Sequence, residues 1–350
     1  MDIRDANENL EFRKVQITGK SSYIVSLPKS WVKNNKIKKG DTLTIIEEEE
    51  GELRIAKVLE TKKRERPIPK IVMDELSDSE LITTVLGNYA MGVDGLEIVS
   101  ENRDMDFAKR KVAMDTIRSL VGFEVISESP NSIKVKNLLE PSDFNLDEVI
   151  NRLALISTSM LKNATSAIVD LDPEKVKEVE AQDNEVDRLY LLTQRLLAVG
   201  LRDKVTARKI GLDSNGAAIG WSTIIRSIER IADASTEIAQ QIETLGKFKI
   251  PGEVLNLHSK FNKEIASLTN DVLVAGSQKD PKAALEALRK LEKLDKLRED
   301  IRRTETEKPI EPKALLSLET VNNALKGVIN NTRDILKVLI NSEYWQNFKK

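Results

Sequence analysis

The sequence contains no cysteine and only one histidine, His258, among 350 residues. The absence of cysteine excludes disulfide bonds, thiol nucleophiles and cysteine-ligated metal centres. A single histidine excludes histidine-rich zinc sites and argues against histidine-based acid–base catalysis. His258 follows Leu257 in a segment of helical periodicity, so we expect it at the surface or boundary of a helix.

Long apolar runs are also missing. No stretch approaches the roughly 18 apolar residues of a membrane-spanning helix, and no leading segment has signal-peptide character. The glycines do not follow the GxGxxG or GxxxxGK[ST] spacing of phosphate-binding loops, and no Ser/His/Asp set is present. The sequence therefore predicts a soluble, cytoplasmic protein that is not inserted in a membrane and is not an enzyme.

Acidic residues are missing from one stretch of an otherwise balanced chain. The sequence has 55 basic and 57 acidic residues, yet Phe12–Gly40 contains eight basic residues and no acid. Apolar residues alternate from residue 15 to residue 55, which predicts four short strands, and Pro28 opens a helical turn between the second and third. Because a ββαββ unit of about 45 residues buries too little apolar surface alone, we expect it to pair with a second copy.

Four motifs in this stretch occur together: Arg13–Val15, Gly19-Lys20, Leu27–Lys33 and the turn Ile37–Asp41. Their combination resembles the SpoVT/AbrB swapped-hairpin DNA-binding domain. The resemblance implies a homodimer or higher oligomer whose hairpins interleave into one β-barrel that binds double-stranded DNA. The residues predicted to bind DNA, from the family pattern and the basic run, are Arg13, Lys14, Lys20, Lys29 and Lys33. The alternative is that the module only dimerises and that its lysines form a solvated face.

A charged stretch with two prolines, Lys62–Arg66 followed by Pro67 and Pro69, predicts a linker, since the prolines end any helix. It separates an AbrB-like domain of residues 1–60 from a small α/β linker domain of residues 67–140. In the latter, the pattern predicts strands at 71–72, 96–100, 123–127 and 132–135 and helices at 79–90 and 106–121. The predicted order is βαβαββ.

From residue 145 onward the pattern is that of long amphipathic helices, at 146–169, 173–198 and, after a basic connector, 217–245. This triplet recurs. Asp172-Pro173 and Asp280-Pro281 are 108 residues apart, and so are Asp187 and Asp295. The helical domain of residues 145–350 is therefore expected to consist of two three-helix repeats, 145–246 and 253–345.

Carboxylates lie four residues apart on two helices of the first repeat, as Asp183/Asp187 and Glu229/Asp233. Residues at this spacing share a helix face. The repeat with these two pairs resembles the PhoU family, which has two three-helix bundles per chain and regulates phosphate uptake. The whole chain resembles an archaeal-type fusion of AbrB and PhoU domains.

If the two helices pack against each other, the four carboxylates converge into a metal site. Oxygen ligands suit Mg²⁺, Mn²⁺ or iron, and the PhoU resemblance adds iron or zinc. The alternative is that Arg188, Arg226 and Arg230 neutralise an ordinary charged surface. In the second repeat, Asp183 is replaced by Leu291 and Asp233 by Asn323, so a second cluster at Asp295, Glu319 and Asn323 is expected to be weak or absent.

The predicted fold is multidomain α+β, with an AbrB-like swapped-hairpin β-barrel, a small α/β middle domain and tandem PhoU-like three-helix bundles. The predicted function is a DNA-binding transcriptional regulator of phosphate homeostasis, with the PhoU-like half as sensor or partner-binding half for phosphate-transport or signalling proteins. One alternative is an adaptor that regulates a phosphate transporter by protein contact, with the barrel only dimerising. A toxin-neutralising role of the MazE kind is a third hypothesis, against which the long C-terminal half argues.

Overall fold

The computed structural model describes residues 11–19, 21–47, 51–57, 68–101, 104–278 and 281–347, without side chains at 273–278, 281 and 342–347. The chain divides into two compact units, Met1–Arg66 and Pro67–Lys350. Lys20 and the predicted linker Lys62–Arg66 lie outside the described residues. No described helix is long and apolar enough to span a membrane.

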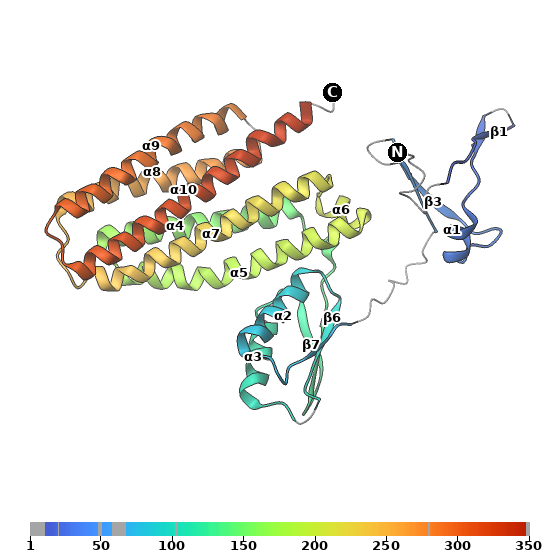
Figure 1. The fold of residues 1–350 in the computed structure, drawn as a ribbon, viewed down its shortest axis with the longest axis horizontal. Coiled ribbons are helices and arrows are strands. Elements are labelled where there is room, and N and C mark those ends of the chain that lie inside the picture. Colours follow the sequence, from blue (N-terminus) through green and yellow to red (C-terminus); the bar gives the residue numbers. More distant parts are fainter. Residues whose placement is uncertain are drawn as a thin grey trace, which may run out of the picture. The chain divides into compact units, whose positions relative to one another are not determined.

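The first unit has the predicted ββαββ order (Figure 1). Strands β1 (Gln16–Thr18) and β2 (Ser22–Ile24) form one antiparallel hairpin, in which Ile17 is paired with Tyr23. Helix α1 (Lys29–Asn34) follows. Strands β3 (Leu43–Glu47) and β4 (Leu53–Lys57) form the second hairpin, in which Ile45 is paired with Ile55.

The apolar residues of these hairpins do not form a core within one chain. Tyr23 is 75% exposed, Ile17 66% and Ile45 62%. None of the described residues between 11 and 57 is buried. The alternating pattern thus produces an apolar face that nothing in the described part of the same unit covers.

The second unit begins with an α/β module that has the predicted βαβαββ order. Its elements are β5 (Lys70–Val72), α2 (Asp78–Ala90), β6 (Gly95–Val99), α3 (Phe107–Arg118), β7 (Phe123–Ser129) and β8 (Ser132–Asn137). The strand order is β5-β6-β8-β7, with β5 and β6 parallel and the other pairs antiparallel. Both helices lie on the same side of the sheet (Figure 1) and bury an apolar core against it. Ser77 and Glu80 form a capping box that fixes the start of α2.

Two sets of three long helices follow, as predicted. Helices α4 (Leu146–Asp170), α5 (Pro173–Arg202) and α7 (Asn215–Leu245) pack against one another. Helices α8 (Gly252–Gln278), α9 (Pro281–Glu307) and α10 (Pro312–Asn347) form the second set. The two sets are joined by contacts of α7 with α10 and of α4 with α8, and they share one apolar core.

Between α5 and α7 the chain forms a short helix, α6 (Lys204–Ile210), in the segment that the sequence predicted only as a basic connector. Asp203 caps its first turn by accepting from the backbone N–H groups of Val205 and Thr206. Gly211 ends it in the left-handed conformation, at φ 81°. An aspartate before and a glycine after the segment were the signals that predict such a helix. A 3₁₀ turn, η2 (Pro141–Asp143), precedes α4.

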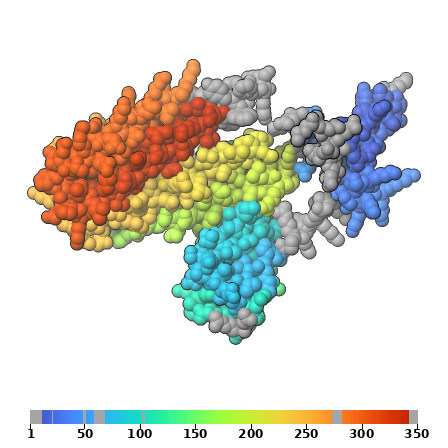
Figure 2. Space-filling model, in the orientation of Figure 1, coloured from blue at the N-terminus to red at the C-terminus, as the bar shows by residue number. Residues whose placement is uncertain are grey.

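The α/β module is packed on helix α5. The guanidinium of Arg195, which is 3% exposed, donates to the backbone oxygen of Tyr89 at 3.0 Å. It also lies over the rings of Tyr89 and Phe123, at 5.1 and 5.4 Å from their centroids. Figure 2 shows the cyan surface of this module adjoining the green and yellow surface of the bundle. The division into domains 67–140 and 145–350 stays a prediction.

The expectation that His258 lies at the surface is wrong. Its side chain is fully buried, and its Nε2 is 2.6 Å from Oε1 of Glu305, which is 1% exposed. Asn322 donates to the other carboxylate oxygen at 2.5 Å. The three side chains come from α8, α9 and α10, so the position of His258 depends on how these helices pack rather than on its neighbours in sequence.

Candidate functional site

The first candidate site lies where helices α5 and α7 pack side by side. Asp187 of α5 and Glu229 and Asp233 of α7 each offer one carboxylate oxygen, and these oxygens lie within 4.8 Å of one another. In the described part of the chain this is the one group of three or more such side chains close enough to hold a metal ion. The structure thus brings together three of the four residues that the sequence predicted.

The fourth residue, Asp183, lies one helical turn before Asp187. Its Oδ1 accepts a hydrogen bond from the hydroxyl of Thr236 at 3.1 Å. Thr236 was not predicted to belong to the site, although its position three residues after Asp233 places it on the same face of α7. Asp183 therefore flanks the group, and its oxygen is held by a neutral donor.

The surroundings of the three carboxylates favour their protonated forms. Burial, together with the charges of Asp183 and Asp233, raises the pKa of Asp187 to about 6. Burial, together with Asp233 and Asp187, raises the pKa of Glu229 to about 7. Burial and Asp183 also raise the pKa of Asp233. A bound cation would offset this like-charge repulsion, because opposite charge favours the ionised carboxylates.

Nearby arginines do not cancel the repulsion. Arg226 and Arg230 lower the pKa of Glu229, but burial and the neighbouring carboxylates have the larger effect. Neither of them, nor Arg188, forms an ion pair with any acidic residue that the structure describes. Asp187 and Asp233 are exposed and Glu229 is half-buried, so the cluster is a group of surface carboxylates without an ion-pair partner in the described part of the chain.

In the second repeat, the corresponding carboxylates are paired with arginines. Asp295 lies 3.4 Å from Nε of Arg298 and 3.5 Å from a guanidinium nitrogen of Arg333. Glu319 pairs with Arg302 at 3.2 Å. These carboxylates are thus neutralised separately instead of facing one another. The expectation that a cluster of Asp295, Glu319 and Asn323 binds metal weakly or not at all stays a prediction.

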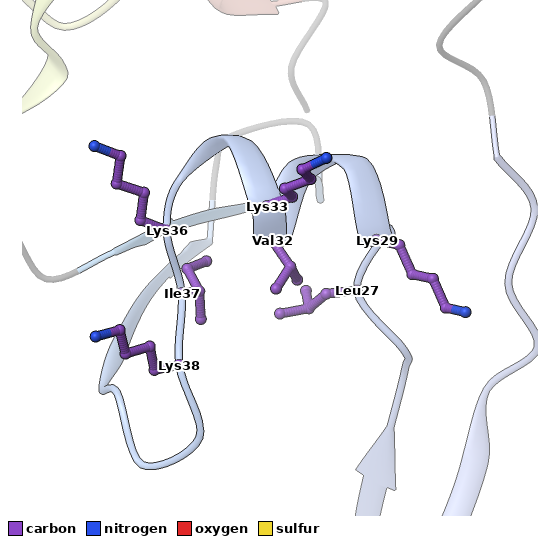
Figure 3. A pocket seen from close by; sticks show the side chains of 7 residues that line it. All are labelled: Leu27, Lys29, Val32, Lys33, Lys36, Ile37 and Lys38. Carbon is purple, nitrogen blue, oxygen red and sulfur yellow. The ribbon is translucent and has the colours of Figure 1, made fainter.

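The second candidate site is a groove of about 360 Å³ in the first unit (Figure 3). It lies between helix α1 and the turn that follows. Lys29 and Lys33, both predicted to bind DNA, line it, and Lys36 and Lys38 line it as well, although the sequence pattern did not single them out. Its floor consists of Leu27, Val32 and Ile37.

Two further predicted DNA-binding residues, Arg13 and Lys14, do not line the groove, and Lys20 is not among the described residues. Arg13 is exposed and forms an ion pair with Glu11. Lys14 is exposed in the extended segment before β1. The structure therefore groups Lys29 and Lys33 with two further lysines and leaves Arg13 paired with an acid.

Two family models match the chain. Residues 150–242 match the PhoU domain, and residues 16–66 match the antidote-toxin recognition domain MazE of bacterial antitoxins. The first unit is thus similar to a MazE-type module and the helical part to a PhoU domain. The predicted resemblances to an AbrB-type domain and to PhoU are thereby confirmed. All four predicted metal-binding residues lie within the PhoU match.

Solved structures resemble the helical part of this chain. PhoU from Pseudomonas aeruginosa is 14% identical with a TM-score of 0.51, and the match covers 56% of this chain and 93% of that one. The phosphate transport system regulatory protein PhoU from Streptococcus pneumoniae is 17% identical with a TM-score of 0.48, over 57% of this chain and 93% of that one. No curated protein matches the sequence. The similarity to the Pseudomonas structure indicates that the helical part of the chain has the same fold as that PhoU protein.

Replacing Asp187 by asparagine should raise the melting temperature of the metal-free protein at pH 8. If the cluster binds Mn²⁺, the ion should raise the melting temperature of the wild type, and the same substitution should remove this rise. The pKa values of Asp187 and Glu229 are raised from 3.8 and 4.5 to about 6 and 7. The folded protein therefore holds protons that the unfolded chain has released, and stability falls as the pH rises through this interval. Because the carboxylates are partly exposed, solvent screening leaves an effect on the order of 1 kcal/mol.

Scanning fluorimetry at pH 5 and pH 8, with and without Mn²⁺, measures both effects. The difference between variant and wild type should shrink at pH 5, where the cluster is largely protonated. Asp295→Asn is the matched control, because Asp295 already faces two arginines and its replacement should leave the response to Mn²⁺ intact. An equal response to Mn²⁺ in all three proteins would show that the cluster does not bind the ion.

Proposed function

We propose that the protein is a homodimeric, DNA-binding transcriptional regulator of phosphate uptake. The MazE-type module binds double-stranded DNA, and the PhoU domain receives the regulatory input. The phosphate part of the proposal comes from the PhoU match over residues 150–242. The DNA part comes from the match over residues 16–66 and from the SpoVT/AbrB resemblance of the same stretch.

The observation that carries the DNA-binding proposal is the set of unpaired lysines around α1. Lys29, Lys33, Lys36 and Lys38 form no ion pair with any residue in the described ranges. The acid-free composition of Phe12–Gly40 explains why, since no carboxylate is available within the run. Cations concentrated in this way attract the phosphates of nucleic acid, which supply most of the non-specific binding free energy.

The exposed apolar face of the first unit supports the dimer. Tyr23, Ile17 and Ile45 lie on strands that a second copy is expected to cover, as the swapped-hairpin resemblance implies. A two-fold symmetric module would bind a pseudo-palindromic site. The dimer would also bring two sets of groove lysines to one duplex.

The carboxylate cluster is proposed as the metal site of the regulatory half. Three carboxylate oxygens within 4.8 Å fit a hard cation, so Mg²⁺, Mn²⁺ or iron suits the donors, and zinc remains part of the hypothesis through the PhoU resemblance. One member of the cluster, Asp187, lies on α5, the same helix that holds the α/β module through Arg195. Metal occupancy would thus act on the helix that joins the two parts of the second unit.

Full-length protein should bind double-stranded DNA with an affinity that falls steeply with salt. If about six phosphates are neutralised, log affinity should decrease with log salt at a slope of about −5. Lys14→Ala and Lys33→Ala should each flatten the slope by about 0.9 for every phosphate left without its cation, and each substitution removes two cations from a dimer. Fluorescence anisotropy with labelled DNA across a salt series measures the slope.

Lys326→Ala is the control for this experiment. Lys326 is an exposed lysine on helix α10, outside the MazE-type module. Its removal should leave the slope unchanged. Absence of binding at low salt would refute the DNA-binding proposal and favour the adaptor function.

The adaptor function is the second candidate, and helix α6 is the observation that favours it. The first repeat uses residues 203–214 to connect its last two helices, whereas the second repeat uses only 308–311. The longer connector presents exposed Arg208 and Lys209, while Ala207 and Ile210 anchor it in the core. The second repeat shows that four residues are enough to connect these helices, so the bundle does not need helix α6 as a connector. A capped basic helix of this kind is suited to contact an acidic surface of a transporter protein.

A further inference from the structure

We infer that Lys36 and Lys38 contact DNA phosphates together with Lys29 and Lys33, so that the groove in Figure 3 is a four-lysine binding site for one stretch of sugar-phosphate backbone. The inference rests on the proposed DNA-binding function. It adds two residues that the family resemblance does not nominate, and it identifies the surface on which the phosphates lie.

The groove places its four lysines on two opposite sides of an apolar floor. Lys29 and Lys33 are four residues apart on α1 and therefore share a face of that helix. Lys36 and Lys38 belong to the turn that follows. Figure 3 shows Val32, Leu27 and Ile37 gathered between them, with the ammonium groups pointing away from this floor. The long aliphatic stems flank the floor while the charges stay in solvent, where a polyanion can reach them.

The backbone conformation at Lys36 is uncommon for a residue with a side chain. Two backbone hydrogen bonds end helix α1. The N–H of Lys36 donates to the carbonyl oxygen of Lys33 at 3.1 Å, and the N–H of Ile37 donates to the carbonyl oxygen of Val32 at 3.0 Å. This is a Schellman motif, in which the residue at the position of Lys36 adopts the left-handed conformation and is usually glycine. Lys36 has φ 51°. A side chain at this position destabilises the turn relative to glycine.

The same unit uses glycine for its other left-handed positions. Gly19, Gly40 and Gly51 have φ values of 68°, 94° and 75°, and Lys36 is the only non-glycine residue with positive φ among those described in this unit. Conformation alone therefore favours glycine at position 36. Leu171, at the end of α4 in the second unit, has the same φ of 51° with an apolar side chain, so the conformation of Lys36 marks the position and the charges around the groove carry the inference.

The charges around the groove favour a polyanion as its ligand. Asp41 is the acidic residue nearest in sequence to the groove lysines. It forms an ion pair with Lys57 at 2.8 Å and accepts a hydrogen bond from the backbone N–H of Lys38. Its charge is thus already balanced by a cation outside the groove. The four groove lysines have no ion-pair partner in the described part of the chain. Four cations on an open groove match the repeating charges of a nucleic-acid strand better than a single small anion.

The test is the substitution Lys36→Gly in the full-length protein. The variant should be at least as thermally stable as the wild type, because glycine relieves the left-handed position. It should nevertheless bind a labelled double-stranded DNA of random sequence more weakly, with a salt dependence flatter by about 0.9 for each phosphate that Lys36 neutralises in the wild type. A purely structural role of Lys36 would not produce greater stability with weaker binding.

Lys38→Ala provides a second variant that does not alter a left-handed position, and it should flatten the salt dependence to a similar degree. Lys33→Ala separates this inference from the proposal on which it rests. If Lys33→Ala flattens the slope while Lys36→Gly and Lys38→Ala leave it unchanged, the four-lysine site is wrong and DNA binding stands. If the wild type does not bind DNA at low salt, both are wrong.

Discussion

Replacing Glu305 by alanine should lower the free energy of unfolding of the helical bundle by about 3–5 kcal/mol. The carboxylate lies 2.6 Å from Nε2 of His258 and accepts a hydrogen bond from Asn322 at 2.5 Å, and all three residues are at most 1% exposed. Its removal leaves two buried polar groups without a partner and opens a cavity among three helices. The midpoint of urea unfolding, followed by circular dichroism, measures the loss.

Two further variants make this experiment specific. Glu305→Gln should be less destabilising than alanine, because the amide keeps an oxygen for His258, and rotation of the Asn322 amide would offer its unpartnered Oδ1 to the new N–H₂ group. Glu319→Ala removes a carboxylate from the partly exposed pair with Arg302 and should cost less than about 1 kcal/mol. Equal losses for Glu305→Ala and Glu319→Ala would contradict the buried network.

If the protein forms the proposed dimer, with twice the 39.3 kDa mass of the chain, Tyr23→Asp should convert it to a monomer. Tyr23 is 75% exposed in one chain and lies opposite Ile17 on the apolar face of the first hairpin. If a second copy covers this face, the new carboxylate would be buried without a partner, which is strongly unfavourable. Analytical ultracentrifugation of the full-length chain measures the mass.

Phe107→Asp is the matched control for the dimer. Phe107 is an equally prominent aromatic residue, 82% exposed, but it begins helix α3 in the second unit. Its replacement should leave the mass unchanged. A dimer that persists in Tyr23→Asp would place the contact between copies elsewhere, and dissociation by Phe107→Asp would place it on the α/β module.

Periodicity in the sequence was sufficient to predict the strands and the long helices. The alternation around Ile17 and Tyr23 correctly predicted hairpins, and the pattern after Asp172-Pro173 predicted a helix to about residue 198, which the structure extends to Arg202. Such patterns succeed because the side-chain periods of strands and helices are fixed by backbone geometry alone. Helix α6 was missed because seven residues are too few for a periodic signal.

The carboxylate pairs were also predictable, but their arrangement was not. A spacing of four residues places Asp183 with Asp187 and Glu229 with Asp233 wherever the segments are helical. Which of them meet depends on the packing of α5 on α7, and the structure selects Asp187, Glu229 and Asp233 while Thr236 engages Asp183. In the second repeat the corresponding Asp295 faces arginines instead.

The sequence by itself determined the long helices and the strands, the acid-free basic run and the two family resemblances, because each depends on residues close together in the chain. It also determined the internal repeat, because the same short motif occurs twice. Only the tertiary structure decided that His258 is buried against Glu305, that Arg195 holds the α/β module on α5, and that Lys36 adopts a left-handed conformation beside Lys33. Burial and charge pairing depend on which elements meet in space, and that is set by the packing of the whole chain rather than by local pattern.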